Sequence, residues 1–104
     1  MTTVLLTSRD PLTAGDGAYA ARAARDLAHA GEPVTLVLLE DAVTLARLGH
    51  RDVEHLVGAL DAGVEVLVEE DARKRRAVEP IDGVKPTSFV EVVDRLTADR
   101  SAWL

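Results

Sequence analysis

The sequence contains no cysteine among its 104 residues. This absence excludes disulfide frameworks, thiol catalysis and cysteine-held zinc, and the chain cannot itself carry sulfur as a persulfide. Aromatic residues are also scarce at 3% of the chain, whereas hydrophobic residues of all kinds make up 47%. The core must therefore be built from Val, Leu and Ala, which suit a sheet covered by closely packed helices.

Long apolar stretches are missing as well. The longest are much shorter than the roughly 20 residues of a membrane helix, and the amino terminus has no basic segment followed by an apolar one. We therefore expect a cytoplasmic protein without a membrane partner. Basic residues are in the minority, 12 against 18 acidic ones, and the net charge of −6 repels polyphosphate, so nucleic acid is not an expected partner.

Strand-like and helix-like segments alternate along the chain. Short apolar runs predict strands over residues 3–7, 34–39, 64–68, 84–85 and 102–104. Helical periodicity and capping residues predict helices over residues 17–30, 41–49 and 52–62, and a last helix from residue 88. We therefore expect a single α/β domain over residues 1–104, a three-layer α/β/α sandwich with a mainly parallel five-stranded sheet.

The spacing of apolar residues also predicts which helix faces are buried. In the first helix the sheet-facing set is Tyr19, Ala20, Ala23, Ala24 and Leu27. In the last helix, Ser88 and Glu91 have the form of a capping box, and the predicted buried stripe is Phe89, Val93 and Leu96. Asp41, Asp52 and Asp71 are expected to cap the helices that follow them.

One stretch carries a family resemblance. Gly63-Val64-Glu65-Val66-Leu67-Val68 leads into Lys74-Arg75-Arg76-Ala77, which is similar to a strand followed by a Lys-x-Arg-Gly segment, with alanine in place of the glycine. Together with Gly83-Val84-Lys85-Pro86 and the aromatic Trp103, this pattern resembles the DsrE/DsrF/DsrH family, which includes the Tus sulfur-relay subunits. The resemblance covers essentially the whole chain.

The resemblance implies where a reactive thiol would be. Sulfur-carrying members place a cysteine just after the third strand, and the matching position here is Ala72. Its neighbours Glu69, Glu70 and Asp71 would raise the pKa of any thiol there. The chain is thus similar to the cysteine-poor, DsrH-like branch. The implied role is non-catalytic support or regulation of sulfur relay, as a homo-oligomer or a hetero-oligomer with a related cysteine-bearing subunit.

A second interpretation is a binding site for a small molecule, nucleotide or divalent metal. The loops after the strands of a parallel sheet meet at one edge, and here they carry Arg9, Asp10, Glu40 and Asp41 besides the acidic run after the third strand. Such carboxylates suit magnesium, but helix capping and solvation already explain these residue types and are the favoured interpretation. We therefore assign no metal and no cofactor.

Other motifs are weaker. Gly15 and Gly17 belong to a G-x-G-x-x-A pattern that opens a helix and would suit phosphate, but a loop separates it from the first strand. His50 and His55 are five residues apart and would not share a helical face, so they and His29 are interpreted as surface residues. The basic run 73–76 is interpreted as a solvated face or as a contact for an acidic loop of a neighbouring subunit. No catalytic residue is assigned, and an enzyme is not the favoured interpretation.

Overall fold

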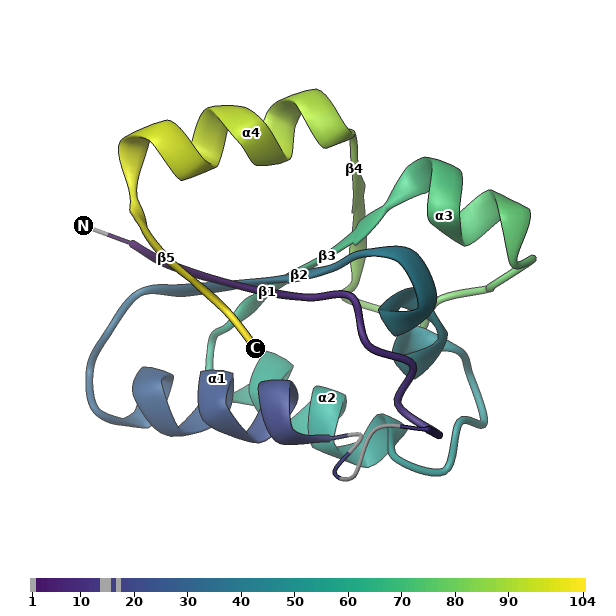
Figure 1. Cartoon of the computed structure of the whole chain (residues 1–104). Coiled ribbons are helices and arrows are strands. Elements are labelled where there is room, and N and C mark those ends of the chain that lie inside the picture. The colour runs from purple at the N-terminus through teal and green to yellow at the C-terminus, as the bar shows by residue number, and fades with distance from the viewer. Residues whose placement is uncertain (1, 14–15, 17) are drawn as a thin grey trace.

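A parallel sheet forms the centre of the molecule (Figure 1). A computed structural model describes residues 2–13, 16 and 18–104. The strands are β1 Thr3–Thr7, β2 Val34–Leu38, β3 Glu65–Glu69, β4 Lys85–Thr87 and β5 Arg100–Trp103, in the order β4-β3-β2-β1-β5. Every neighbouring pair runs parallel. The predicted fold class is confirmed, with strand bounds shifted by up to two residues.

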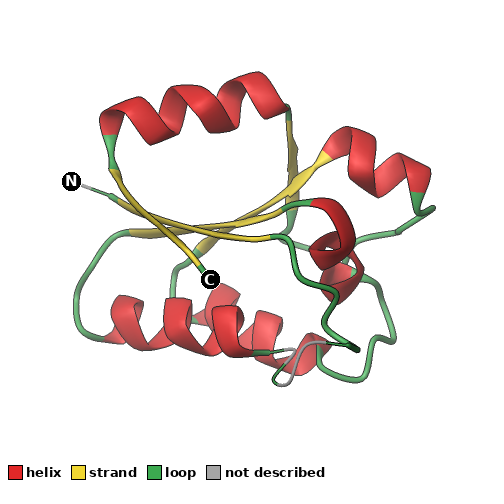
Figure 2. Ribbon diagram, in the orientation of Figure 1, coloured by secondary structure: helices red, strands yellow, loops and turns green. Residues whose placement is uncertain are grey.

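Helices cover both faces of the sheet. They are α1 Tyr19–His29, the 3₁₀ segment η1 Glu40–Ala46, α2 Val53–Asp61, α3 Glu70–Arg75 and α4 Phe89–Ala98. Figure 2 shows α1 and α2 on one side of the sheet and α4 on the other. The short α3 follows β3 directly and lies beyond its carboxyl end. The molecule is therefore the three-layer sandwich that the alternation of strands and helices predicts.

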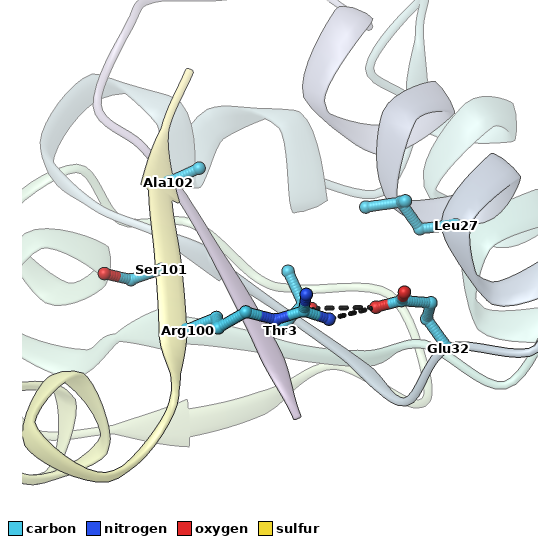
Figure 3. A pocket seen from close by; sticks show the side chains of 6 residues that line it. All are labelled: Thr3, Leu27, Glu32, Arg100, Ser101 and Ala102. Atoms are coloured by element: carbon cyan, nitrogen blue, oxygen red, sulfur yellow. Dashed lines mark hydrogen bonds and ion pairs between the residues drawn. The ribbon is translucent and has the colours of Figure 1, made fainter. Parts of the chain in front are cut away.

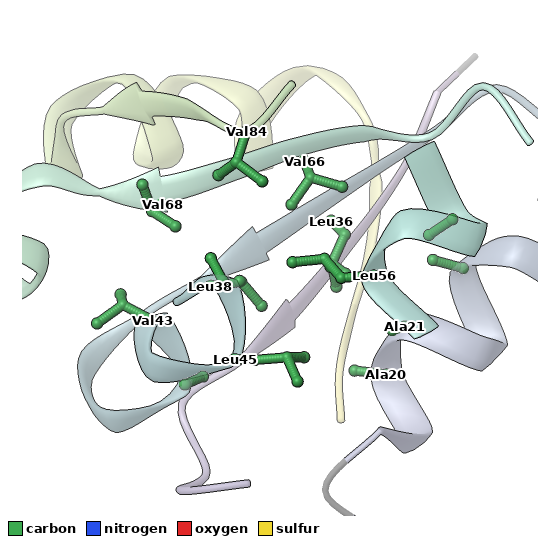
Figure 4. Close-up of a cluster of buried hydrophobic side chains, with 14 of the residues drawn as sticks. Ala20, Ala21, Leu36, Leu38, Val43, Leu45, Leu56, Val66, Val68 and Val84 are labelled. Carbon is green, nitrogen blue, oxygen red and sulfur yellow. The ribbon is translucent and has the colours of Figure 1, made fainter. Parts of the chain in front are cut away.

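Two aliphatic clusters form the core, one on each face of the sheet. Side chains alternate along a strand, so Leu36 and Leu38 of β2 belong to the larger cluster and Val37 to the smaller. The larger cluster lies between the sheet and the α1–α2 layer (Figure 4). The smaller consists of Val4, Leu6, Val37, Leu39, Leu67 and Val92. Neither contains an aromatic residue.

The buried face of α4 differs from the predicted one. Val92 is buried and Leu96 half-buried, whereas Phe89 and Val93 are 58% and 46% exposed. Both stripes share Leu96, so apolar spacing alone does not choose between them. Arg95 lies on the opposite flank of the helix from Phe89 and Val93, and its guanidinium donates to Glu65 Oε1 at 2.7 Å. The observed orientation of α4 thus includes an ion pair with β3 that apolar spacing does not predict.

The prediction for α1 also differs from the structure at two residues, Tyr19 and Ala21. Tyr19 is 54% exposed, although it was placed in the sheet-facing set. The helix begins at Tyr19 rather than at residue 17, and the fully buried residues are Ala21 and Ala24. Small alanine side chains lie against the sheet, which leaves no room for a phenol at the start of the helix.

Candidate functional site

The position that the sequence resemblance matches to a cysteine, Ala72, lies in α3, just beyond the carboxyl end of β3. Ala72 is fully buried and belongs to the larger core cluster. A side chain added at this position would point into packed aliphatic groups rather than into solvent. The structure thus places Ala72 near the carboxyl edge of the sheet, but closes it off.

Glu69 occupies the start of α3 with its own carboxylate. This side chain is only 5% exposed, and its oxygens accept hydrogen bonds from the backbone N–H of Asp71 at 2.6 Å and of Ala72 at 3.2 Å. Free amides at a helix start favour negative charge, so the carboxylate stabilises the first turn. The donors that would otherwise face an anion at position 72 are therefore already satisfied by the chain itself.

The predicted caps are wrong in two places. Asp71 was expected to cap α3, but the cap is Glu69, and the Asp71 side chain is exposed. Asp41 was expected to cap the segment after β2, but it lies within the first turn of η1, whose N-cap residue is Leu39. Asp52 does precede α2, although its side chain makes no cap hydrogen bond. Ser88 caps α4 as predicted, accepting from the Glu91 N–H at 3.1 Å.

The acidic residues after β2 meet the basic run of the same chain. Asp41 Oδ1 accepts from Arg76 Nε at 3.0 Å and from Nη2 at 2.9 Å. Glu40 lies 3.5 Å from Arg76 and 3.6 Å from Arg75, measured between carboxylate oxygen and guanidinium nitrogen. Glu70 similarly pairs with Arg73 at 2.6 Å. The three arginines of the basic run therefore pair with carboxylates of their own chain, which the sequence interpretation did not predict.

In the described part of the chain, the residues after β1 form no ion pair with this acidic group. Arg9 is exposed, and Asp10 Oδ1 accepts from the Leu12 N–H at 2.9 Å, which shapes a local turn. The predicted glycines Gly15 and Gly17 lie outside the described residues. Asp16 accepts from the Ala18 N–H at 3.2 Å and pairs with Arg22.

No metal site emerges in the parts of the chain that are described, since no three His, Asp or Glu side chains gather closely enough to hold an ion. The magnesium interpretation of the acidic edge therefore has no geometric support. His50 differs from the predicted surface histidine because it is half-buried. Its Nδ1 accepts from the Asp52 N–H at 3.1 Å, while Nε2 is buried without a partner in the described structure.

Sequence reasoning missed a hollow of about 280 Å³ at the opposite, amino end of the strands (Figure 3). It is lined by Thr3, Leu27, Glu32, Arg100, Ser101 and Ala102. Glu32 Oε2 accepts from Arg100 at 2.8 Å and from the Thr3 hydroxyl at 3.0 Å. Glu32, Arg100 and Thr3 thus hydrogen-bond to one another. The lining residues lie far apart in the sequence, so no local motif predicts this hollow.

A second polar network lies at the amino ends of β2 and β3. Glu65 accepts from Arg95 at 2.7 Å and from the Thr35 hydroxyl at 2.8 Å. Partial burial by itself raises the pKa of Glu65, but the hydrogen bonds from Arg95 and Thr35, with the charges of Arg95 and Lys85, outweigh it. The net result is a pKa below the ordinary value for glutamate.

The helices of the described structure are all too short or too polar to cross a membrane. This agrees with the absence of long apolar stretches from the sequence.

Fold and edge together define an open, all-parallel α/β domain in which a buried alanine and a capping carboxylate close the position after the third strand. No family model matches the chain, and no curated protein matches it. Among solved structures, the chain is similar to the YchN protein from E. coli, with 21% identity, complete coverage of both chains and a TM-score of 0.86.

A conserved protein of unknown function from Bacteroides thetaiotaomicron is also similar, at 14% identity and a TM-score of 0.83, covering 99% of this chain and 94% of the other. Likeness at these identities shows the fold. The match to YchN supports the DsrE-like fold that the sequence resemblance implies.

Proposed function

We propose that this chain is a non-catalytic, DsrE/DsrH-like subunit that supports or regulates sulfur relay through protein contacts. It acts as a homo-oligomer or beside a related cysteine-bearing subunit. The observation that carries the proposal is the closed position after β3, where Ala72 is buried and Glu69 takes the amides of α3. A DsrE-like fold with this position closed is suited to contact and not to covalent sulfur transfer.

The distribution of aromatic residues supports the contact half of the proposal. Tyr19, Phe89 and Trp103 are the chain's three aromatic residues, and each is more than half exposed. Aromatic side chains are enriched where proteins bind one another, because they bury large areas at little cost in conformational entropy. The core of this protein is built without them, so they remain available for a partner.

The proposal that the chain does not carry sulfur covalently is tested by mixing the purified protein with low-molecular-weight persulfide donors and measuring its intact mass. We expect the mass to stay unchanged, since the chain offers no thiol. A cysteine-bearing sulfur carrier in the same mixture serves as the positive control. A covalent sulfur adduct on this chain would overturn the non-catalytic assignment.

The contact half is tested by native mass spectrometry of the protein recovered gently from its own cells. We expect a complex that contains more than one copy, or this chain together with a cysteine-bearing relative. A bare monomer at the concentrations found in the cell would contradict this half and leave the covalent half standing.

A further inference from the structure

We infer that a second copy of this chain binds along the open edge of β5, around a twofold axis, and covers the apolar surface between α4 and β5. The inference rests on the oligomeric part of the proposed function and names the surface that would form the assembly.

The surface in question, called the α4–β5 surface, consists of Phe89, Val93 and Trp103. Trp103 is 62% exposed, and Phe89 and Val93 are about half exposed. Aromatic side chains bury about 150–250 Å² each when covered, so Phe89 and Trp103 alone expose roughly 100–150 Å² apiece. With Val93, the surface supplies about two fifths of the roughly 800 Å² per partner that a standard interface buries.

These side chains lie on one side of the sheet. Trp103 pairs in register with Leu6, whose side chain is in the cluster beneath α4, so Trp103 projects from the same face. On α4, Arg95 reaches across β2 and β3, which leaves Phe89 and Val93 on the flank toward β1 and β5. Figure 1 shows β5 leaving the end of α4 and running back beneath it toward the carboxyl edge.

The two edges of the sheet are protected differently. At the β4 edge, Pro86 lacks an N–H and Lys85 adds a charge, both features that discourage pairing with another strand. β5 is the outermost strand on the other side. Leu104 donates its N–H to Leu6 O at 2.8 Å, so by alternation the amides of Ser101 and Trp103 point away from β1, toward the open edge.

A second copy can form hydrogen bonds with the open backbone groups of β5 in a single symmetric register. In an antiparallel pair centred on Ala102, Ser101 of each copy exchanges two hydrogen bonds with Trp103 of the other. Both outward-facing residues are then paired, and the large Trp103 side chain lies beside a small serine on the same face. The two α4–β5 surfaces meet on that face, which is why a second copy of this chain fits better than an unrelated strand.

The sharpest test uses the absence of native cysteine. The register places the two copies of Ala102 directly opposite, about 4.5 Å apart between Cα atoms, within disulfide range. An Ala102→Cys variant should therefore cross-link to a dimer under mild oxidation. Since facing thiols reach effective concentrations in the millimolar range, cross-linking at tens of micromolar protein should be about a hundredfold faster than for Leu48→Cys. Leu48 is exposed in the segment that follows η1 and serves as the matched control.

A second measurement removes the apolar contact. Sedimentation velocity should show wild-type dimer, whereas Trp103→Glu and Phe89→Lys should shift the population to monomer with unchanged far-UV circular dichroism. Leu48→Glu should behave as wild type. A wild-type oligomer that survives both α4–β5 substitutions, with no rapid cross-linking at residue 102, would overturn the inference and leave the oligomeric proposal intact. A monomeric wild type would overturn both.

Discussion

The closed environment of Ala72 predicts that a cysteine introduced at this position will not be a reactive thiol. In an Ala72→Cys variant, the thiol should react with a chromogenic disulfide reagent slowly in buffer and rapidly in denaturant. Asp71→Cys, whose side chain is exposed, is the control and should react rapidly in both. Equal rates for the two native variants would contradict the closed geometry.

Ala77 occupies the position where the resembling segment has glycine, and its backbone explains that glycine. Its φ is 50°, in the left-handed region, which costs a residue with a Cβ roughly 1–2 kcal/mol. Ala77→Gly should remove this strain from the folded state. Glycine also gives the unfolded chain more conformational entropy, which offsets part of the gain, so the net stabilisation should be about 0.5–1 kcal/mol.

Urea unfolding measures this difference. Ala30→Gly is the matched control, because Ala30 is also exposed but has a negative φ of −79°. It should be neutral or destabilising. Stabilisation of both variants, or of neither, would show that backbone strain at residue 77 is not the cause.

At the scale of elements, the strands could be predicted because continuous Val and Leu runs such as residues 34–39 leave few alternatives. The rotation of α4 about its axis could not be predicted from the sequence. The observed orientation brings Arg95 to Glu65, thirty positions earlier in the chain, and periodicity contains no information on such a long-range contact. The pairing of Asp41 with Arg76 was missed for the same reason, since both residues lie on connections whose course depends on tertiary structure.

The contact between α4 and β3 predicts a dependence on pH. The folded protein holds the pKa of Glu65 below its ordinary value, so the charged carboxylate adds stability above the unfolded pKa. That stability is lost as the pH falls through the lowered folded pKa. For a partly exposed pair it amounts to less than about 1 kcal/mol.

Urea unfolding between neutral pH and about pH 3 tests this, since ordinary glutamates titrate near 4.3. Glu65→Gln should be slightly less stable than wild type at neutral pH, and the difference should vanish in acid. Glu54→Gln, an exposed substitution on α2, should follow the wild type throughout. A gap that stays constant down to pH 3 would show that Glu65 acts through packing and not through its charge.

At the scale of the whole molecule, β2 joins the two halves of the core because it contributes side chains to both clusters. Leu36 is fully buried in the larger one. Leu36→Ala should cost about 2–5 kcal/mol, a large part of the 5–15 kcal/mol typical of a domain. Leu48→Ala, which is 77% exposed, should change the free energy of unfolding by less than about 0.5 kcal/mol. Far-UV circular dichroism in urea compares the two, and similar midpoints would contradict the placement of the core.

The absence of aromatic residues from the interior also affects how the native state looks to spectroscopy. Near-UV dichroism arises from aromatic rings held in fixed, asymmetric surroundings, and here Tyr19, Phe89 and Trp103 all extend into solvent. The folded monomer should therefore combine a strong far-UV spectrum with a faint near-UV one, a pattern that normally marks a molten globule. For this protein, faint near-UV bands belong to a well-packed native state, and dye binding or sharp methyl resonances would distinguish the two.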